Sequence, residues 1–475
     1  MESGTIFENL SPLDHRYRHS NPELFDRLSR YLSEEASVRY CLRVEAALTA
    51  VHARSFMPEG DDPAPVLDRA AEEIDPAEVY EEEEKTRHNM RAVVRVFKRH
   101  IPGAFRPLVH LGATSVDVLD TALAMRLRDL TKELLIPELA RLVALLSRLA
   151  VTHAEVPQVG RTHGQYAVPI TAGFTFAEYA ARLGKCLPEI EGRVKGLRGK
   201  LRGAVGAYNA TALISDDPRQ LEKELLSRLG LEPAEFATQM VEPEHLIRLV
   251  QEINVAFGVI ANLADDLRNL QRSEIGEVQE HFSAEQVGSS TMPQKRNPWN
   301  SEHVKSLWKA FAPRIMTLYM DQISEHQRDL SNSASMRFLA EYMSGFAAAV
   351  SRMIRIVETL RVDKEAMQEH LRRAGSSLLA EPLYILLALS GESDGHETIR
   401  RLTVEARESG RTLATLILEE EQLRDRLAAQ LRVVSNLSLE TFLSDPSSYT
   451  GMAGRIAEEI GSRYVSMATK YGGER

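Results

Sequence analysis

The richest group of chemically active side chains lies in residues 288–298, which consist of Gly-Ser-Ser-Thr-Met-Pro-Gln-Lys-Arg-Asn-Pro. The Gly-Ser-Ser start has no side chain that could anchor a helix or strand, so we predict a mobile loop there. Asn297 followed by Pro298 is a good N-cap and first-turn pair for a helix over residues 299–320. A hydroxyl-bearing loop, Lys295, Asn297 and a helix N-terminus together suit a carboxylate or phosphate. The alternative is an ordinary Gly/Ser/Pro-rich connection that ends in a cap.

Three further segments place reactive polar residues where packing does not require them. His163 lies in the glycine-bearing string Arg-Thr-His-Gly-Gln, between two expected helices. Residues 110–115 end in Thr114 and Ser115, whose hydroxyls at a helix N-terminus can hold an anion. Residues 328–337 combine arginines with hydroxyls, which suits phosphate or carboxylate. Taken singly, these residues could be a structural histidine, a helix cap and surface ion pairs, but their joint occurrence favours a functional site.

The sequence contains none of the common metal or nucleotide motifs. It has no His-Glu-x-x-His, no Cys/His pair at ligand spacing and no carboxylate cluster like a calcium loop. It also lacks Gly-x-Gly-x-x-Gly after a strand and the phosphate-binding Gly-x-x-x-x-Gly-Lys-Ser/Thr. We therefore expect no metal and no cofactor, and a reaction that runs on side chains alone.

The elements that must position these segments are expected to be helices. Leu, Ala, Arg and Glu dominate and aromatic residues make up only 6%, which favours helix over sheet. Apolar spacing predicts helices over residues 21–53, 115–153 and 171–197, with a kink at Pro137. The acidic run Glu-Glu-Glu-Glu is expected to open a further helix that continues to residue 100. The predicted fold class is all-α.

One helical stretch carries an unbroken heptad pattern. Its apolar residues alternate steps of three and four: Leu246, Leu249, Ile253, Ala256, Ile260, Leu263, Leu267 and Leu270. Such a seam needs partner helices, in a monomeric core or in an elongated bundle that associates with its own copies, and we expect a homo-oligomer.

Residues 156–169 look loop-like, and no strand-rich block is visible. Composition changes divide the chain into an N-terminal helical domain (1–113), a central long-helix domain (114–362) and a C-terminal helical domain (363–475).

Charge and cysteine content limit the partners and the compartment. The 475-residue chain has a formal net charge of -10, which argues against nucleic acid and anionic membranes as partners. No signal peptide or stretch approaching a membrane span is expected from the hydropathy pattern. The two cysteines, Cys41 and Cys186, have no ligand or redox spacing and are predicted to be buried packing residues. A cytoplasmic protein is the expected outcome.

Taken in order, these segments resemble the fumarase/aspartase superfamily, and within it the adenylosuccinate lyase branch. Residues 288–298 are similar to the signature loop of the superfamily. The branch is indicated by further blocks over nearly the whole chain, which are residues 11–17, 85–88, 110–117, 161–165, 203–209, 268–277 and 328–337. The resemblance implies a three-domain all-α fold with a central long-helix bundle, and a homotetramer whose active sites are shared between subunits. It also implies elimination of fumarate from the nucleotide adenylosuccinate to give AMP, and from SAICAR to give AICAR, in purine biosynthesis.

The resemblance also implies roles for individual residues. Ser289 would be the base that removes the Cβ proton, and His163 would be the acid that protonates the leaving nitrogen, oriented by Glu302. The residues that would bind the substrate are Arg16, Tyr17, His88, His110, Thr114, Ser115, Thr162, Gln239, Lys295, Asn297, Arg328, Ser333 and Arg337. Among them, Lys295 and Asn297 would hold the succinyl carboxylate. The arginines, Tyr17 and Ser333 would hold the phosphate and neighbouring groups.

Three positions depart from the pattern of the branch. His15 stands where glycine is usual, Asn332 replaces a common histidine, and Gln294 fits argininosuccinate lyases as well as adenylosuccinate lyases. Sister lyases such as argininosuccinate lyase or a carboxymuconate cycloisomerase therefore stay open as alternatives. So does a non-catalytic helical scaffold derived from a lyase, although a scaffold would need neither Ser289 nor His163.

Overall fold

The structure is a computed structural model that describes residues 8–283, 288 and 290–473. The chain divides into two compact units, each built from separate stretches of sequence. Unit 1 comprises Met1–Leu139, Lys185–Ala261 and Val304–Arg352, and unit 2 comprises Ala140–Gly184, Asn262–His303 and Met353–Arg475. The three-domain division expected from the sequence stays a prediction.

Five long helices contain the points at which the chain passes from one unit to the other. They are α8 (Ile136–Thr152), α9 (Ala172–Lys195), α11 (Glu244–Leu270), α12 (Trp299–Phe311) and α14 (Leu339–Glu358). The heptad seam lies on α11, and its positions from Leu249 to Leu267 are buried. By length and composition alone α11 could cross a membrane, so the expectation that no stretch approaches a span was wrong on that criterion. Its most apolar window is 56% buried, and a core helix passes the same test.

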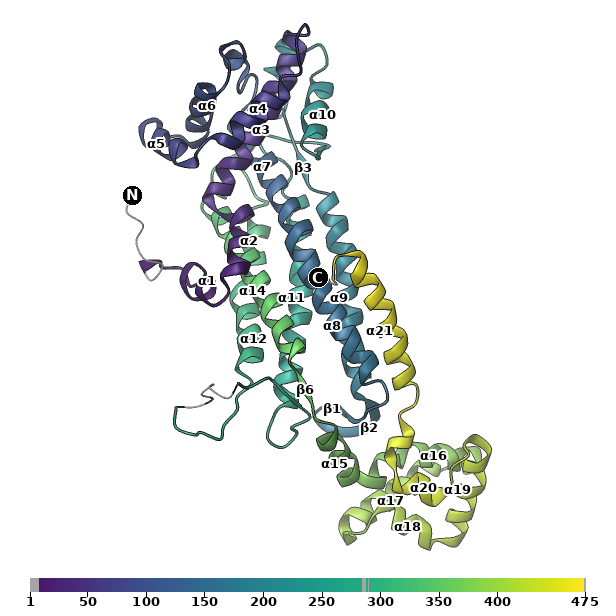
Figure 1. Cartoon of the computed structure of the whole chain (residues 1–475). Coiled ribbons are helices and arrows are strands. Elements are labelled where there is room, and N and C mark those ends of the chain that lie inside the picture. The colour runs from purple at the N-terminus through teal and green to yellow at the C-terminus, as the bar shows by residue number, and fades with distance from the viewer. Residues whose placement is uncertain (1–7, 284–287, 289, 474–475) are drawn as a thin grey trace. The chain divides into compact units, whose positions relative to one another are not determined.

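Unit 1 contains a run of helices from the N-terminal part of the chain, shown in purple and blue in Figure 1. The helices wholly within it are α1 (Arg18–Ser20), α2 (Pro22–Leu32), α3 (Glu34–Phe56), α4 (Ala64–Glu73), α5 (Pro76–Thr86), α6 (Asn89–His100), α7 (Ser115–Leu130), α10 (Pro218–Arg228) and α13 (Ile315–Met320). A short parallel pair joins β3 (Arg198–Gly199) to β4 (Glu232–Pro233). Ser33 separates α2 from α3 because its hydroxyl accepts the N–H of Ala36 and caps α3.

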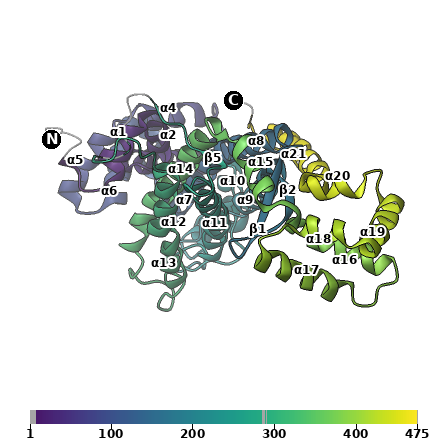
Figure 2. The same ribbon diagram turned by 90° about the horizontal axis from the view of Figure 1, so that it is seen from below.

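The acidic run lies at the end of a helix rather than at the start of one. α5 ends at Thr86, because Arg87 takes a left-handed conformation with φ of 54°. His88 then caps α6, so the single helix expected up to residue 100 is two helices. Glu82, buried within the run, is paired with Arg95 and Arg99 of α6 at 3.1 Å each. α5 and α6 lie side by side in Figures 1 and 2.

The long helix expected over residues 115–153 is present but interrupted. A π-helical turn over Thr131–Leu135 separates α7 from α8. Pro137, in the first turn of α8, has no N–H to donate to the preceding turn, which explains why the regular hydrogen-bond ladder fails there. The hydrogen-bond pattern therefore changes just ahead of the proline, while the kink at Pro137 stays a prediction.

Unit 2 contains the longest strand pair and a group of short helices. The strand pairs are β1 (Pro157–Thr162) with β2 (Gln165–Thr171), and β5 (Val278–Gln279) with β6 (Arg361–Val362), both antiparallel. The helices wholly within it are α15 (Lys364–Ala374), α16 (Ala380–Leu389), α17 (Gly395–Ser409), α18 (Leu413–Glu419), α19 (Glu421–Val434), α20 (Leu439–Ser444) and α21 (Ala453–Lys470). Figures 1 and 2 show α16 to α20 gathered together. They share a core of leucines that includes Leu383, Leu387 and Leu427. The expected all-α class is confirmed, since helices dominate the described chain and its strands are few and short.

Candidate active site

His163 lies at the tip of the β1–β2 hairpin in unit 2. The turn has two residues, His163 with φ of 53° and Gly164 with φ of 73°. Positive φ at both central positions is the type I′ geometry that matches the twist of paired strands. The loop expected over residues 156–169 was therefore wrong. The sequence signal for a hairpin was the His-Gly pair followed by the β-rich stretch over residues 165–171. Thr162 and His163 are both exposed at this tip.

The base of the hairpin is held by a buried carboxylate, Glu277, which is 0% exposed. Arg161 donates two hydrogen bonds to it, at 2.6 Å to Oε1 and 3.1 Å to Oε2. Gln158 donates a third from Nε2 at 2.7 Å, and its own Oε1 accepts the hydroxyl of Thr175 at 2.8 Å. The strand that leads to His163 is thus tied down two residues before the tip. Sequence reasoning gave Glu277 no role, because its partners lie more than a hundred positions away.

A second contact holds the other strand of the hairpin. The hydroxyl of Tyr166 is 2.7 Å from Nδ1 of His370 on α15, and Nε2 of His370 is 2.8 Å from the carbonyl oxygen of Ile275. Because His370 contacts an oxygen through each ring nitrogen, its orientation is fixed from both sides. The guanidinium of Arg161 also lies over the Tyr166 ring, 5.3 Å from its centroid. Both strands are therefore anchored next to an exposed turn.

The partner expected for His163 is also exposed. Glu302 lies in the first turn of α12, and its backbone N–H donates to the carbonyl of Pro298 at 3.0 Å. In the described part of unit 2, no hydrogen bond joins the side chains of His163 and Glu302. The orienting role of Glu302 therefore stays a prediction.

The signature segment is described only in part. Ser289, the predicted base, lies outside the described residues. Beside it, the side-chain amide of Asn297 donates to the carbonyl of Gly288 at 3.0 Å, which closes the segment on itself. Lys295 is exposed, and its backbone N–H donates to the carbonyl of Met292 at 3.1 Å. The ammonium of Lys295 thus remains near a fixed backbone and in contact with solvent.

The N-terminus of α12 is occupied by a carboxylate of the chain itself. Glu280 accepts the backbone N–H of Ser301 at 2.8 Å and that of Asn300 at 3.2 Å. It also accepts the side chains of the same two residues, at 2.6 and 3.0 Å. A carboxylate there meets the free amides and positive end of the helix. Glu280 therefore takes up two of the free N–H groups of this helix end. That Lys295, Asn297 and the helix end together hold a substrate anion stays a prediction.

In unit 1, the segment before α7 is held by buried polar groups. Asp117, which is 2% exposed, accepts the N–H of Thr114 at 2.8 Å. The same carboxylate accepts the N–H groups of Arg202 and Gly203 at 2.9 and 3.1 Å and pairs with the buried ammonium of Lys200. Four donors on one carboxylate fix the start of α7, where the predicted contacts Thr114 and Ser115 lie half-exposed.

His110 is held at the other end of this segment. Its Nδ1 is 2.6 Å from Oε1 of Glu45 on α3. Burial disfavours the charged imidazolium, but the hydrogen bond and the negative charge of Glu45 outweigh it, so the pKa of His110 lies above its usual value. One residue further, the carbonyl of Leu111 is 2.9 Å from Nε2 of His52. Burial lowers the pKa of His52, which makes it a neutral neighbour.

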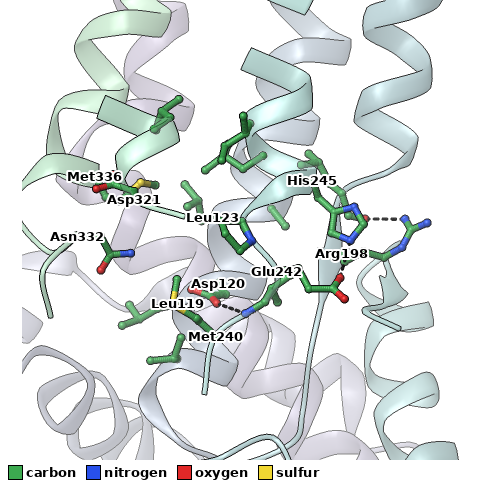
Figure 3. Close-up of a pocket in the computed structure, with 18 of the residues that line it drawn as sticks. Leu119, Asp120, Leu123, Arg198, Met240, Glu242, His245, Asp321, Asn332 and Met336 are labelled. Carbon is green, nitrogen blue, oxygen red and sulfur yellow. Dashed lines mark hydrogen bonds and ion pairs between the residues drawn. The ribbon is translucent and has the colours of Figure 1, made fainter. Parts of the chain in front are cut away.

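A cavity of about 210 Å³ in unit 1 collects part of the predicted phosphate site. Arg328, Asn332 and Ser333 line it together with aliphatic residues of α7 and the start of α11. Figure 3 shows Asp120 between Asn332 on one side and Glu242 with His245 on the other. Asp120 accepts the N–H of Val241 at 2.8 Å, and burial raises the pKa of Asp120 to about 6. No motif or spacing indicated that Asp120 would line a cavity.

A larger neighbouring cavity, of about 920 Å³, contains the remaining arginine of that string, Arg337. The lining residues common to both cavities are Leu119, Leu123, Leu127, Ser333 and Met336. Arg87, Asn89 and Arg126 add polar groups to the larger one, and so do the carboxylates of Glu34, Glu83 and Glu84. Its volume is within the usual range for small-molecule sites. The structure therefore brings Arg328, Ser333 and Arg337 to two adjoining cavities, and their role in binding a phosphate stays a prediction.

Several other predicted contacts do not line these two cavities as the described chain forms them. They are Arg16, Tyr17, His88, His110, Thr114, Ser115 and Gln239. Arg16 is exposed, and burial raises the pKa of Tyr17 against the lowering effect of the Arg352 charge. Nδ1 of His88 accepts the N–H of Arg91 at 3.3 Å. The N–H of Gln239 donates to the carbonyl of Gln327 at 3.4 Å, which joins it to the segment that carries Arg328.

The remaining expectations concern metals and cysteines. Among the described residues, no group of three or more His, Cys, Asp or Glu side chains could hold a metal ion. Cys41 and Cys186 are both free thiols and both buried, as predicted.

Comparisons with known proteins agree on the family. A family model described as "Lyase" matches residues 17–311, and one described as "Adenylosuccinate lyase C-terminal" matches residues 324–440. The chain is 31% identical to the adenylosuccinate lyase of Pyrococcus abyssi over 94% of its length and 96% of the relative, and 29% identical to that of Bacillus subtilis over 87% and 94%.

The solved structures that resemble the chain give the same fold. A 3-carboxy-cis,cis-muconate lactonizing enzyme from Pseudomonas putida matches with a TM-score of 0.79 and 25% identity, over 94% of this chain and 97% of that one. A fumarate lyase from Mesorhizobium sp. BNC1 matches with a TM-score of 0.79 and 21% identity, over 92% and 97%. The first is similar in name to the cycloisomerase alternative, yet the C-terminal family model and the two relatives from Pyrococcus abyssi and Bacillus subtilis carry the adenylosuccinate lyase name. The chain therefore belongs to the adenylosuccinate lyase family of the fumarase/aspartase superfamily.

Proposed function

We propose that the chain eliminates fumarate from adenylosuccinate to give AMP, and from SAICAR to give AICAR. The observation that supports this substrate class best is the gathering of Arg328, Ser333 and Arg337 at two adjoining cavities of unit 1. Two arginines and a hydroxyl suit a nucleotide phosphate, and a substrate without a phosphate has little use for them. This is the feature that favours adenylosuccinate over the substrates of sister lyases.

The proposed reaction is a proton abstraction followed by loss of an amine. Ser289 removes the proton from Cβ, the electron pair left there forms the carbon–carbon double bond of fumarate, and the C–N bond breaks. His163 gives a proton to the departing nitrogen, so the nucleotide product leaves as a neutral amine. Negative charge grows on the succinyl carboxylate during the reaction, and Lys295 and Asn297 are placed to stabilise it. Glu302 orients His163.

We further propose that four copies of the chain form a homotetramer in which neighbouring subunits complete each active site. His163 supports this, because it is exposed on a rigid hairpin without a side-chain partner in the described chain. Division into three domains (1–113, 114–362 and 363–475) and a cytoplasmic location are parts of the same proposal.

The test is turnover of adenylosuccinate by the purified full-length protein, with AMP and fumarate both followed. Ser289→Ala should abolish turnover and leave the oligomer size unchanged, because the variant loses only the base. Arg337→Ala and Arg16→Ala should raise KM more than they lower kcat, since a phosphate contact is present before and during the chemical step. A well-folded oligomer that does not turn over adenylosuccinate would refute the proposal. Unchanged KM in both arginine variants would point to a substrate without a phosphate.

A further inference from the structure

Glu45 is a buried carboxylate with a single side-chain partner. It lies on α3, is 0% exposed, and its Oε1 is 2.6 Å from Nδ1 of His110. Its other oxygen, Oε2, has no hydrogen-bond partner among the described residues. A buried carboxylate is costly unless it is paired with a cation and hydrogen-bonded. Glu45 therefore needs His110 in its protonated form.

His110 has one ring nitrogen left for another molecule. Its side chain is 22% exposed, and its backbone is held in the left-handed region with φ of 63°. Nδ1 faces Glu45, and no hydrogen bond of Nε2 is recorded in the described chain. Five residues later the same segment starts α7 with Ser115, whose N-terminal end favours negative charge. Nε2 of His110 and the N-terminus of α7 thus belong to one short segment of the chain.

The titratable groups around His110 come from three helices. Glu45 and His52 lie on α3, Asp117 lies on α7 and Lys98 lies on α6. The hydrogen bond and charge of Glu45 raise the pKa of His110, with help from Asp117, while burial and Lys98 lower it. The balance is a pKa above the usual value of histidine. In the protonated ring, Nδ1–H donates to Glu45 and Nε2–H remains as a charged donor.

We propose that Glu45 is a positioning residue that keeps His110 an imidazolium, so that its Nε2–H donates to an anionic oxygen of the substrate. The inference rests on the proposed function, and it adds a buried residue that never touches the ligand. The anionic oxygen is supplied by the phosphate or by a succinyl carboxylate. Inhibition by the two products separates these sources, because AMP carries only the phosphate and fumarate only the carboxylates.

The central test is Glu45→Gln, which keeps the size of the side chain and removes its charge. In the wild type, affinity for adenylosuccinate is full below the raised pKa of His110 and is lost as pH rises through it. Without the carboxylate, burial lowers the pKa of His110, so the loss of affinity should shift to lower pH. At pH 8 we expect KM to rise by about tenfold and kcat to change by less than about twofold. The inhibition constant of either AMP or fumarate should rise in parallel.

Two further variants separate positioning from stability. Glu138→Gln is the matched control, because it removes a partly buried carboxylate paired with Arg27 at 2.6 Å, and its pH profile should equal that of the wild type. His110→Asn tolerates the left-handed backbone and should remove the high-pH loss of affinity altogether. The double variant Glu45→Gln/His110→Asn should then be no weaker than His110→Asn alone.

The outcomes are distinguishable. Identical pH profiles of KM in wild type and Glu45→Gln, or additive losses in the double variant, would overturn the inference. If Glu45→Gln does not fold, the test rests on His110→Asn. A loss of affinity at high pH that persists in His110→Asn cannot come from His110 and would overturn the inference. A wild-type protein that does not turn over adenylosuccinate would instead count against the proposed function.

Discussion

Replacing Glu277 by Gln should loosen the hairpin that presents His163. In the wild type, Glu277 is 0% exposed and accepts three hydrogen bonds, two from Arg161 and one from Gln158. The Arg161 side chain is 15% exposed, so water replaces little of the lost charge. Breaking a buried ion pair costs about 3–5 kcal/mol, and because Gln keeps one acceptor we expect the low end, about 3 kcal/mol. This is a large fraction of the stability of most domains.

Hydrogen exchange of the strand amides measures this loss directly. β1 and β2 exchange through local opening, and opening requires the contacts of Glu277 to break. At 1.36 kcal/mol per tenfold change, about 3 kcal/mol corresponds to a decrease in protection of about a hundredfold. Mass spectrometry of a peptide over residues 157–171 would report it. Global unfolding is a poorer measure, because a chain with two compact units need not unfold in two states.

A surface ion pair of the same unit supplies the control. Glu178 pairs with Arg182 at 2.8 Å, and their side chains are 55% and 38% exposed. Exposed pairs of this kind contribute at most about 0.5 kcal/mol, so Glu178→Gln should leave hairpin protection unchanged. If Glu277→Gln also leaves protection within about threefold of wild type, the buried network does not stabilise the hairpin as argued.

Two further predictions follow from the local geometry. His163→Asn should keep the hairpin, because asparagine tolerates positive φ, and should lower kcat by at least about a hundredfold through loss of the general acid; full activity with an intact fold, checked by circular dichroism, would rule His163 out as that acid. Glu280→Ala should lower the stability of the first turn of α12 by about 1 kcal/mol, because the N–H groups of Asn300 and Ser301 lose their acceptor; unchanged exchange protection of that turn would contradict this.

The parts of the fold that the sequence predicted are those set by local spacing. The heptad seam of α11 and the break before Pro137 both depend on residues within a few turns of each other. The single helix expected up to residue 100 failed for a different reason. Arg87 ends α5 in a left-handed conformation, and Glu82 finds Arg95 and Arg99 on the next helix. Neither a left-handed backbone conformation nor an ion pair with another helix produces a periodic pattern in the sequence, so neither could be predicted from spacing.

The candidate site shows the same division. The exposed residues of the four segments were found by type, since hydroxyls, arginines and a histidine in glycine-bearing loops have few structural uses. The carboxylates that support them were not found. Glu45 pairs with a residue 65 positions away in the sequence, and Glu277 pairs with Arg161, which is 116 positions away. Glu280 was not predicted as the acceptor at the start of α12, because Asn297, directly before Pro298, is a more conventional cap for the same helix.

The two-residue turn at the hairpin tip restricts which amino acids could ever replace His163. Positive φ is tolerated by glycine and, among residues with a side chain, mainly by Asn, Asp and His. A side chain that gains and loses a proton near neutral pH narrows the choice to histidine. Backbone and chemistry therefore select the same residue for independent reasons. No single substitution at this position can satisfy both: asparagine or aspartate keeps the turn but loses the group that exchanges a proton near neutral pH.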